Sequence, residues 1–405
     1  MSIRQRLYPE SGQEQVLLRH CSHARFVWNL GLEQRNCWRK DRTTKVGLSS
    51  QCRELARARQ AFSWLEEGSS SVQQQALRDL DQAFQNWWNG THSKPTWRKA
   101  GQNEGFCIRD LSVIRISRRW GEVQVPKCGS VRFRITRNWQ GIEACSSARV
   151  TLDRSRRWHV SFTAIQPAIS REPTGSVIGL DMGVASTATT SDGEFLSLPK
   201  LLSPGEAQRK RRLQRKLARQ KRGSKRRART KLSIARLSAK ETDRRKDWIE
   251  KTTTNLVRDY DLIAIEDLKV KNMVRSASGT KESPGKNVAQ KRGLNREIQS
   301  QSWSLYRKRL EQKADASGVV VVLVNPKYTS QTCSECGYRS DKNRESQAVF
   351  VCKACGLEEH ADANAAKNIL AAGLAVTARR GTPGCRSDEA RTTLVASAAW
   401  ESPGH

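Results

Sequence analysis

Residues 176–185, with the sequence SVIGLDMGVA, form a short apolar run that delivers Asp181 and is closed by Gly183. A run of this length and composition is typical of a buried β-strand. The strand would carry one carboxylate at its end. On its own, an acid in this position fits a turn or cap as well as it fits a catalytic group.

Two further stretches place an acid at the end of a predicted element. Residues 261–267, DLIAIED, read as a second apolar strand that leads into Glu266, and residues 360–370, HADANAAKNIL, predict a helix with Asp362 in its first turn. Small alanines in that helix favour close packing. Strand ends and helix starts are rigid, so they can hold three side chains in one site.

Three carboxylates that converge repel one another and lose hydration, unless a cation compensates their charge. Oxygen ligands suit Mg²⁺ or Mn²⁺ better than Zn²⁺, and two such ions can stabilise an in-line displacement at phosphorus. The residues therefore predict metal-dependent phosphodiester hydrolysis. Asp181, Glu266 and Asp362 are the predicted catalytic residues and the predicted ligands of Mg²⁺ or Mn²⁺.

The motifs GLDMG, AIED and HADANAAKNIL resemble the three RuvC nuclease motifs of TnpB proteins, which bacterial insertion sequences encode and which are relatives of type V CRISPR effectors. The stretches RFVWNLGLEQR at residues 25–35 and YTSQTCSECG at residues 328–337 extend the resemblance to about residue 375. The resemblance implies an RNase H-like nuclease domain. It also implies a monomer with one guide RNA from the transposon end, which cuts double-stranded DNA beside a short flanking motif.

The composition favours a nucleic-acid partner. The chain of 405 residues has 73 Lys and Arg against 40 Asp and Glu, a net charge of +33. Such a charge favours a polyanion through the release of counterions from phosphates. The sequence contains no apolar stretch of membrane-spanning length and no signal-peptide pattern at its start. It predicts a cytoplasmic protein without a membrane partner, and the family resemblance implies a bacterial, nucleoid-associated one.

Four of the eleven cysteines form the most specific local motif. Two Cys-x2-Cys pairs are separated by fifteen residues, a spacing that predicts a tetrathiolate zinc ribbon with the ligands Cys333, Cys336, Cys352 and Cys355. Four thiolates fill the coordination sphere of Zn²⁺, so the predicted metal is structural. The other seven cysteines are expected to be packing residues or incidental thiols.

The first half of the chain predicts helices followed by an antiparallel sheet. A strand is expected at residues 2–8, and helices are expected from residue 11, at 51–62 and at 72–88. Residues 105–167 alternate in short segments, typical of an antiparallel sheet or small barrel. Arginines lie among Trp120, Trp139 and Trp158, which suits stacking on bases and contact with a phosphate backbone.

Residues 209–246 hold 19 Lys or Arg and two acids. A disordered tail and a nuclear localisation signal are alternative interpretations, but leucines at partly helical spacing favour a pair of basic helices that contact the phosphates of an RNA–DNA duplex. Further on, residues 294–316 predict one helix. Residues 318–326, GVVVVLVNP, predict a strand buried on both faces.

The predicted fold is multi-domain α+β, with an RNase H-like (RuvC) nuclease domain, an inserted zinc ribbon, a β-barrel wedge domain and a helical recognition lobe. The expected boundaries are 1–10 with 102–170 for the wedge, 11–101 for the helical lobe, 171–328 with 359–375 for the nuclease, 329–358 for the zinc ribbon that binds target nucleic acid, and 376–405 for a disordered tail.

Three other functions share some of these features. A compact type V CRISPR effector would have the same motifs, and genomic neighbourhood would distinguish it. An RNA-guided repressor would bind without cutting, yet all three acids are retained here. A tyrosine transposase would need a histidine pair of the form HxH, which the six histidines do not provide. His360 stands where many relatives have Asp, and it fits either a supporting donor or a capping residue.

Overall fold

The structure, a computed structural model, describes residues 2–37, 46–136, 139–163, 169–280, 282–379 and 394–395. The chain divides into two units. Unit 1 combines Met1–Pro167 with Gln208–Ala239, and unit 2 combines Ala168–Ala207 with Lys240–His405. The predicted nuclease segment 171–328 is thus split, because its basic portion groups with unit 1.

Unit 1 contains a seven-stranded antiparallel sheet in the order β2-β6-β7-β1-β5-β4-β3. The strands are β1 (Ser2–Tyr8), β2 (Gly105–Arg109), β3 (Val113–Arg115), β4 (Trp120–Val125), β5 (Gly129–Arg134), β6 (Ser147–Leu152) and β7 (Trp158–Thr163). The N-terminal strand pairs with both β5 and β7. The predicted antiparallel sheet that includes residues 2–8 is therefore confirmed. Within the described residues no ladder joins β2 to β3, so closure into a barrel stays a prediction.

Among the described residues, the Met1–Pro167 part of unit 1 also contains five helices. They are α1 (Ser11–Asn36), α2 (Leu48–Ala61), α3 (Ser63–Glu66), α4 (Ser70–Trp88) and α5 (Gln140–Glu143). One hydrophobic cluster contains Leu17 of α1, Val72 of α4 and Phe133 of the sheet, each at most 2% exposed. The predicted helical lobe and wedge thus share one hydrophobic cluster, and α1 and α4 form a second with Trp28 and Phe84.

Unit 2 contains a mixed sheet in the order β10-β9-β8-β11-β12-β15. The strands are β8 (Val177–Asp181), β9 (Ala188–Thr190), β10 (Phe195–Leu196), β11 (Leu262–Glu266), β12 (Val320–Val324) and β15 (Leu394–Val395). The first three pair antiparallel, whereas β8, β11, β12 and β15 run parallel. This is a mixed sheet flanked by helices, as the resemblance implies.

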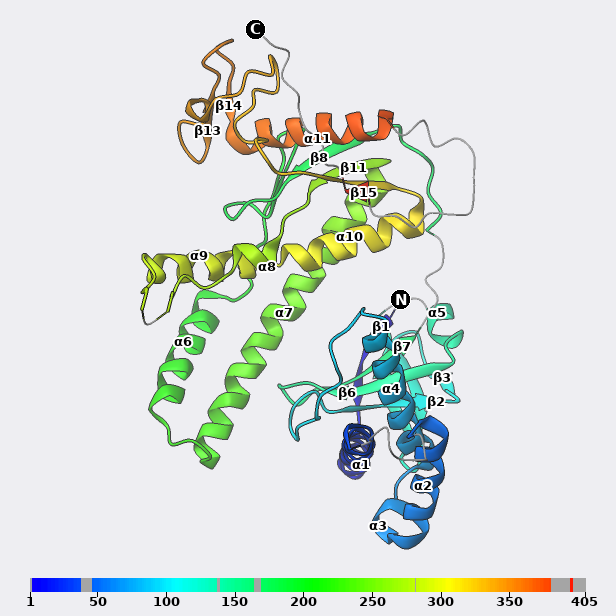
Figure 1. The fold of residues 1–405 in the computed structure, drawn as a ribbon. Helices are drawn as coiled ribbons and strands as arrows, with labels where there is room; N and C mark the ends of the chain where they lie inside the picture. Colours follow the sequence, from blue (N-terminus) through cyan, green and yellow to red (C-terminus); the bar gives the residue numbers. More distant parts are fainter. Residues whose placement is uncertain are drawn as a thin grey trace. The chain divides into compact units, whose positions relative to one another are not determined.

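Helices cover both faces of this sheet (Figure 1). Helix α11 (Ala361–Arg379) lies on one face, and Ile369 packs there against Ala264 and Val322. Helices α7 (Lys225–Asp259) and α10 (Trp303–Ser317) contribute to the opposite core, in which Tyr306 is fully buried. Two of the three catalytic candidates, Asp181 and Glu266, therefore lie on a sheet that is fixed from both sides.

Glycines allow α11 to approach the strands closely. A Cβ atom at Gly179 of β8 would lie 2.2 Å from the carbonyl oxygen of Ala366, and one at Gly373 would lie 2.6 Å from the Cβ of Ala264. Real Cβ atoms do not tolerate such distances, so only glycine fits at these positions. The distance between α11 and the strands depends on these glycines, and so does the position of Asp362.

Two expected helices differ in their extent. The predicted pair of basic helices is confirmed as α6 (Pro204–Arg219) and α7, which continues without a break to Asp259. The single helix predicted for residues 294–316 is wrong. Helix α9 (Val288–Gln301) and α10 are separated at Ser302, whose φ of 58° is left-handed and interrupts the helix. A short helix α8 (Val270–Met273) precedes them.

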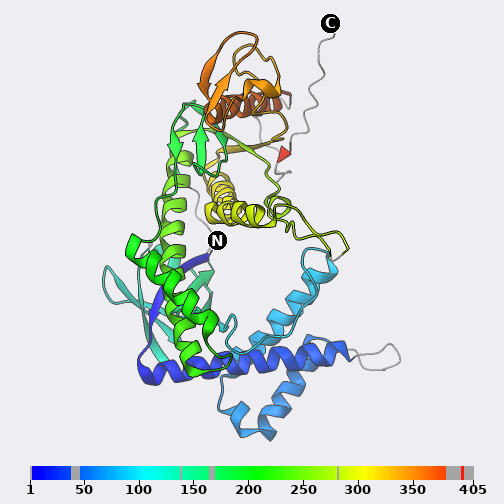
Figure 2. The same cartoon turned by 90° about the vertical axis from the view of Figure 1, so that its left-hand side faces the viewer.

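The four-cysteine segment forms a hairpin at the start of α11 (Figure 2). It contains the 3₁₀-helix η1 (Asp341–Asn343) and the antiparallel strands β13 (Val349–Val351) and β14 (Glu358–His360). The expected disorder from residue 376 is wrong for residues 376–379, because α11 continues through them, and for the strand β15. Residues 380–393 and 396–405 lie outside the described residues. No helix in the described part of the chain is long and apolar enough to cross a bilayer.

We predict that Gly179→Ala will destabilise unit 2, because the added methyl group would push α11 away from β8. Overpacking of this kind costs about 1–3 kcal/mol, or roughly 2–12 °C in melting temperature for a unit of this size. Thermal unfolding measures the effect. Gly205→Ala on α6 is the control, since its Cβ would meet nothing within 4 Å. Equal melting temperatures for both variants would contradict the packing argument.

Candidate active site

Asp181 and Glu266 stand at the carboxyl ends of neighbouring parallel strands. The register pairs Leu180 of β8 with Ile265 of β11, so the two acids follow directly on a paired position. Parallel strands place such residues at the same edge of a sheet, where ligands bind in open α/β sheets. The sheet thus brings the two acids together, as the sequence predicted.

Asp362 reaches the same edge from the first turn of α11. A Cβ atom at Gly183, two residues after Asp181, would lie 3.9 Å from Oδ2 of Asp362. The backbone N–H of Asp362 donates a hydrogen bond to Nδ1 of His360 at 3.2 Å. His360 therefore caps the helix start, and its ring also packs edge-on against Phe195, with ring centroids 4.8 Å apart.

The electrostatics show that the three acids share one environment. Burial raises the pKa of Asp181 to about 7, and the nearby charge of Asp362 adds to this effect. Burial also raises the pKa of Glu266 to about 8, with a further contribution from Asp181 and an opposing one from a hydrogen bond with Thr329. Asp181 is thus coupled to both partners. A cluster held in this way resists ionisation near neutral pH.

Arg344 places a positive charge beside the cluster. Its Nη2 lies 3.2 Å from Oδ1 of Asp362, and it lowers the pKa of Asp181 against the effect of burial. The sequence does not mark this residue as functional. It lies between the two cysteine pairs in a segment without a recognisable pattern, so only the folded hairpin brings it to the site.

The donor set fits hard divalent cations. Glu266 is only 7% exposed, and the Asp362 side chain is 13% exposed. Carboxylate oxygens are the ligands that Mg²⁺ and Mn²⁺ prefer, and buried anions need such compensation. Among the described residues, the four cysteines are the group whose ligand atoms already lie close enough together to hold an ion. The role of the three acids as metal ligands stays a prediction.

A polar network ties the candidate site to the four-cysteine hairpin. The hydroxyl of Thr329 donates to Oε1 of Glu266 at 3.0 Å, and the side chain of Asn368 donates to the carbonyl of Thr329 at 2.9 Å. Asn364, which is fully buried, accepts from the N–H of Ser334 and donates to the carbonyl of Thr332. The sequence analysis missed these asparagines, although their spacing of four on an alanine-rich helix is a detectable signal.

The four predicted cysteine ligands come together. All four Sγ atoms lie within 4.8 Å of one another. The pairs Cys333–Cys355 and Cys336–Cys352 are 3.7 and 3.6 Å apart. A tetrahedron with Zn–S bonds of about 2.3 Å has edges of about 3.8 Å. The cluster can therefore hold zinc.

Three family models match parts of the chain. A model described as "Helix-turn-helix domain" matches residues 1–44, and one described as "Probable transposase" matches residues 159–277. A third, "Cas12f1-like, TNB domain", matches residues 303–369. The second range includes β8 and β11 with their acids, and the third includes all four cysteines and Asp362.

Full-length relatives and a solved structure are similar to the chain. "Putative RNA-guided DNA endonuclease InsQ" of Escherichia coli strain K12 is 35% identical over 92% of both chains. "Putative RNA-guided DNA endonuclease" of Streptomyces pristinaespiralis is 30% identical over 93% of this chain and 90% of that protein. The cryo-EM structure of a Cas12f1–sgRNA–target DNA complex matches with a TM-score of 0.56 and 15% identity, covering 89% of this chain and 83% of the other. That likeness shows a shared fold.

We predict that Glu266→Gln will stabilise the protein in a chelator at about pH 8.5 and leave its stability nearly unchanged at about pH 4.5. The raised pKa means that the folded state binds more protons than the unfolded state, so stability falls as pH rises from about 5 to about 8. Glutamine removes the free-energy cost of burying the charged carboxylate, and its side-chain oxygen can still accept the hydrogen bond from Thr329. We expect a gain of more than about 1 kcal/mol, or a few degrees in melting temperature.

The control for this prediction is Glu297→Gln, an exposed position on α9. It should change the melting temperature equally little at both pH values. A Glu266→Gln variant that is less stable than wild type at the higher pH would show that the buried charge does not destabilise the folded state.

We predict that Cys352→Ser will abolish zinc binding and destabilise the start of α11, because three thiolates cannot close the coordination sphere. Elemental analysis of the purified protein should give one zinc per chain for wild type and a large loss for the variant. Cys37→Ser, at an exposed cysteine outside the cluster, should keep the metal. Full zinc content in Cys352→Ser would exclude the cluster as the metal site.

Proposed function

This chain belongs to the TnpB family, and on that premise we propose that it is an RNA-guided DNA endonuclease of a bacterial transposable element. The observation that carries the proposal is the electrostatic coupling of Asp181 with Glu266 and Asp362 at one sheet edge. A buried cluster of acids destabilises the fold, so it is explained best by a chemical task that requires it.

The three acids would hold Mg²⁺ or Mn²⁺ for phosphodiester hydrolysis. When bound, such ions polarise the phosphate, activate water and stabilise the leaving oxygen. The protein's own part is to fix the carboxylates. Asp181 and Glu266 are held by paired strands, and Thr329 orients the Glu266 carboxylate through its hydrogen bond. Asp362 is held by the close packing of α11 on β8.

Arg344 would contact the substrate at this site. Its guanidinium already lies beside Asp362, and its side chain is 30% exposed, so it can also reach a group outside the protein. Guanidinium groups bind phosphate oxygens through directed, charge-assisted hydrogen bonds. We therefore assign to Arg344 the orientation of the phosphodiester that enters the carboxylate cluster.

The basic helices would bind the guide RNA and its duplex with target DNA. No residue of α6 is buried, so its cationic side chains face solvent. Arg227 at the start of α7 donates to the carbonyl of Gln220 at 3.0 Å and fixes the turn between the two helices. A charged pair of helices with a fixed turn suits the regular phosphate backbone of a duplex. We also include in this proposal two features that the family resemblance implies. The target DNA carries a short flanking motif, and one protein copy binds one guide RNA.

The alternatives are weaker. A compact CRISPR effector would share the fold, but the match to Cas12f1 at 15% identity supports the fold alone, whereas InsQ matches along 92% of both chains. A repressor that only binds DNA would not need the buried acids. Their retention, together with the packing that holds them, favours cleavage over binding alone.

We predict that the protein, purified with RNA expressed from its flanking DNA, will cut a target library with randomised flanks in the presence of Mg²⁺. Asp181→Asn should lower the cleavage rate by more than roughly a hundredfold, beyond the loss typical of supporting residues. Sequencing of the cut ends measures both the rate and the flanking motif.

The matched control is Asp315→Asn, an exposed acid on α10, which should cut like wild type. RNA binding by the Asp181→Asn variant should be unchanged, because the acid lies outside the basic helices. Equal cutting by Asp181→Asn and wild type would overturn the proposed site. Failure of the wild-type complex to cut any flank would overturn the proposed activity.

A further inference from the structure

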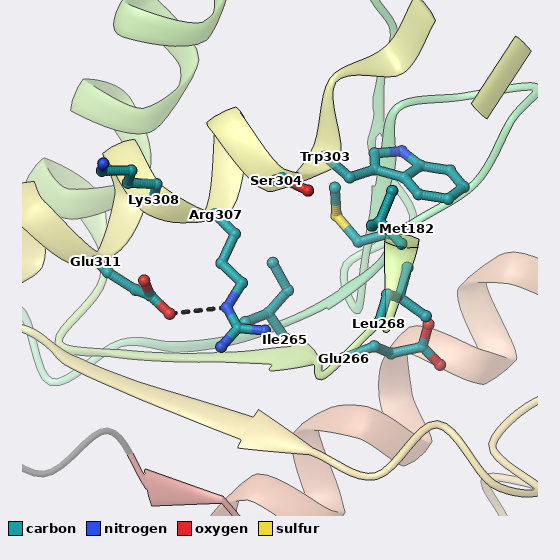
Figure 3. Close-up of a pocket in the computed structure, with 10 residues that line it drawn as sticks. Met182, Ile265, Glu266, Leu268, Trp303, Ser304, Arg307, Lys308 and Glu311 are labelled. Carbon is teal, nitrogen blue, oxygen red and sulfur yellow. Dashed lines mark hydrogen bonds and ion pairs between the residues drawn. The ribbon is translucent and has the colours of Figure 1, made fainter. Parts of the chain in front are cut away.

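A cavity of about 220 Å³ lies beside the carboxylate cluster in unit 2. Its walls come from α10 and from the chain that continues past the end of β11 (Figure 3). The size is below the roughly 300–1,000 Å³ of pockets that bind drug-sized molecules. It suits one small planar group.

The cavity shares one residue, Glu266, with the proposed catalytic site. Glu266 forms part of its wall, and so does Met182, which directly follows Asp181. A group bound in the cavity would therefore contact one of the three acids, Glu266. No described residue of unit 1 lines it.

The two ends of the cavity differ in chemistry. Figure 3 shows Trp303, Met182 and Leu268 together at one end and Arg307, Lys308 and Glu311 at the other. Trp303 is 4% exposed and Met182 is 7% exposed. The first end is thus a dry wall with an aromatic ring and a polarisable thioether, a combination that packs well against flat, apolar surfaces.

The polar end holds two cationic side chains, of which, within the described part of the chain, one forms ion pairs with acids and the other does not. Arg307 is fixed by Oδ1 of Asp267 at 2.6 Å and Oε1 of Glu311 at 2.8 Å. Lys308 is exposed, and among the described residues it forms no ion pair. A lysine next to an apolar slot supplies a point charge for a phosphate, while the slot accepts a base.

We propose that this cavity, which we call the base pocket, binds one unstacked base of the DNA strand next to the phosphodiester that is cut. The proposal rests on the proposed function, because it takes the substrate to be DNA at the carboxylate cluster. The base lies against Trp303 and Met182, and Lys308 pairs with a neighbouring phosphate. The pocket then acts in positioning, since seating one base fixes the adjacent phosphate near Glu266, the acid that lines the pocket.

With a base pocket, one nucleotide contributes more to DNA binding than its neighbours do. The backbone alone would bind every position equally, whereas a pocket for one base makes the loss of that base costly. Removal of the base should therefore impair binding and cleavage at only one nucleotide position beside the cut. The alternative occupant is a side chain of the protein itself that closes the cavity, and the experiments below distinguish the two.

Photocrosslinking tests binding independently of cleavage. Single-stranded DNA that carries 5-iodo-2′-deoxyuridine is irradiated with the wild-type protein–RNA complex in a chelator, and the crosslinked peptides are identified by mass spectrometry. The expected crosslink is in the peptide that contains Trp303. Ser304→Phe, which places a ring in the cavity wall, should reduce this crosslink at least roughly tenfold, equivalent to about 1.4 kcal/mol.

Asp315→Phe is the matched control, since it adds the same ring at an exposed position on the same helix. It should keep the crosslink. Crosslinks that map only to other peptides, or that Ser304→Phe leaves unchanged, would overturn the base pocket. Because no cutting is needed, a crosslink at Trp303 would stand even if the proposed nuclease activity failed.

A second measurement uses target DNA with a single abasic site placed in turn at each position around the mapped cut. For wild type, one adjacent position should lower the cleavage rate roughly tenfold, and the others should have little effect. In Ser304→Phe the rate should already be low, and the abasic site should cause no further loss. Equal sensitivity at all positions, or the same position-dependent loss in Ser304→Phe, would refute the proposal.

Discussion

Like charges that are buried together resist folding, and unit 2 is built to hold three of them at one sheet edge. Two of the acids end neighbouring strands, and the third begins the helix that covers those strands. Burial and mutual repulsion raise the pKa values of Asp181 and Glu266. Every close contact around them can be understood as a way of keeping the cluster in place against this cost.

The four-cysteine hairpin contributes to the site as well as to the fold. It carries Arg344 to Asp362, and the segment that leads into it carries Thr329 to Glu266. Asn364 and Asn368 of α11 hold that segment through its backbone. A structural metal in the hairpin would thus stabilise both the helix start and the hydrogen bond that orients Glu266. This arrangement explains why the ribbon is inserted directly before Asp362 in the sequence.

The sequence predicted the acids and the cysteines because their chemistry depends on residue type and spacing. The strands that end in Asp181 and Glu266 were recognisable as short apolar runs, and the strand at residues 2–8 was recognisable by its alternation. What could not be predicted depends on tertiary contacts. Arg344 has no local pattern, and the break at Ser302 has no glycine or proline to mark it. The grouping of the basic segment with unit 1 likewise follows from contacts far apart in the chain.

The proposed function requires that Asp181, Glu266 and Asp362 together hold divalent cations. Anomalous diffraction from crystals of the protein in Mn²⁺ locates the metal without reference to activity. We expect anomalous density bounded by the carboxylates of all three residues, with a separate zinc signal at the cysteine hairpin. Manganese density elsewhere, or a site that one of the three acids does not touch, would contradict it.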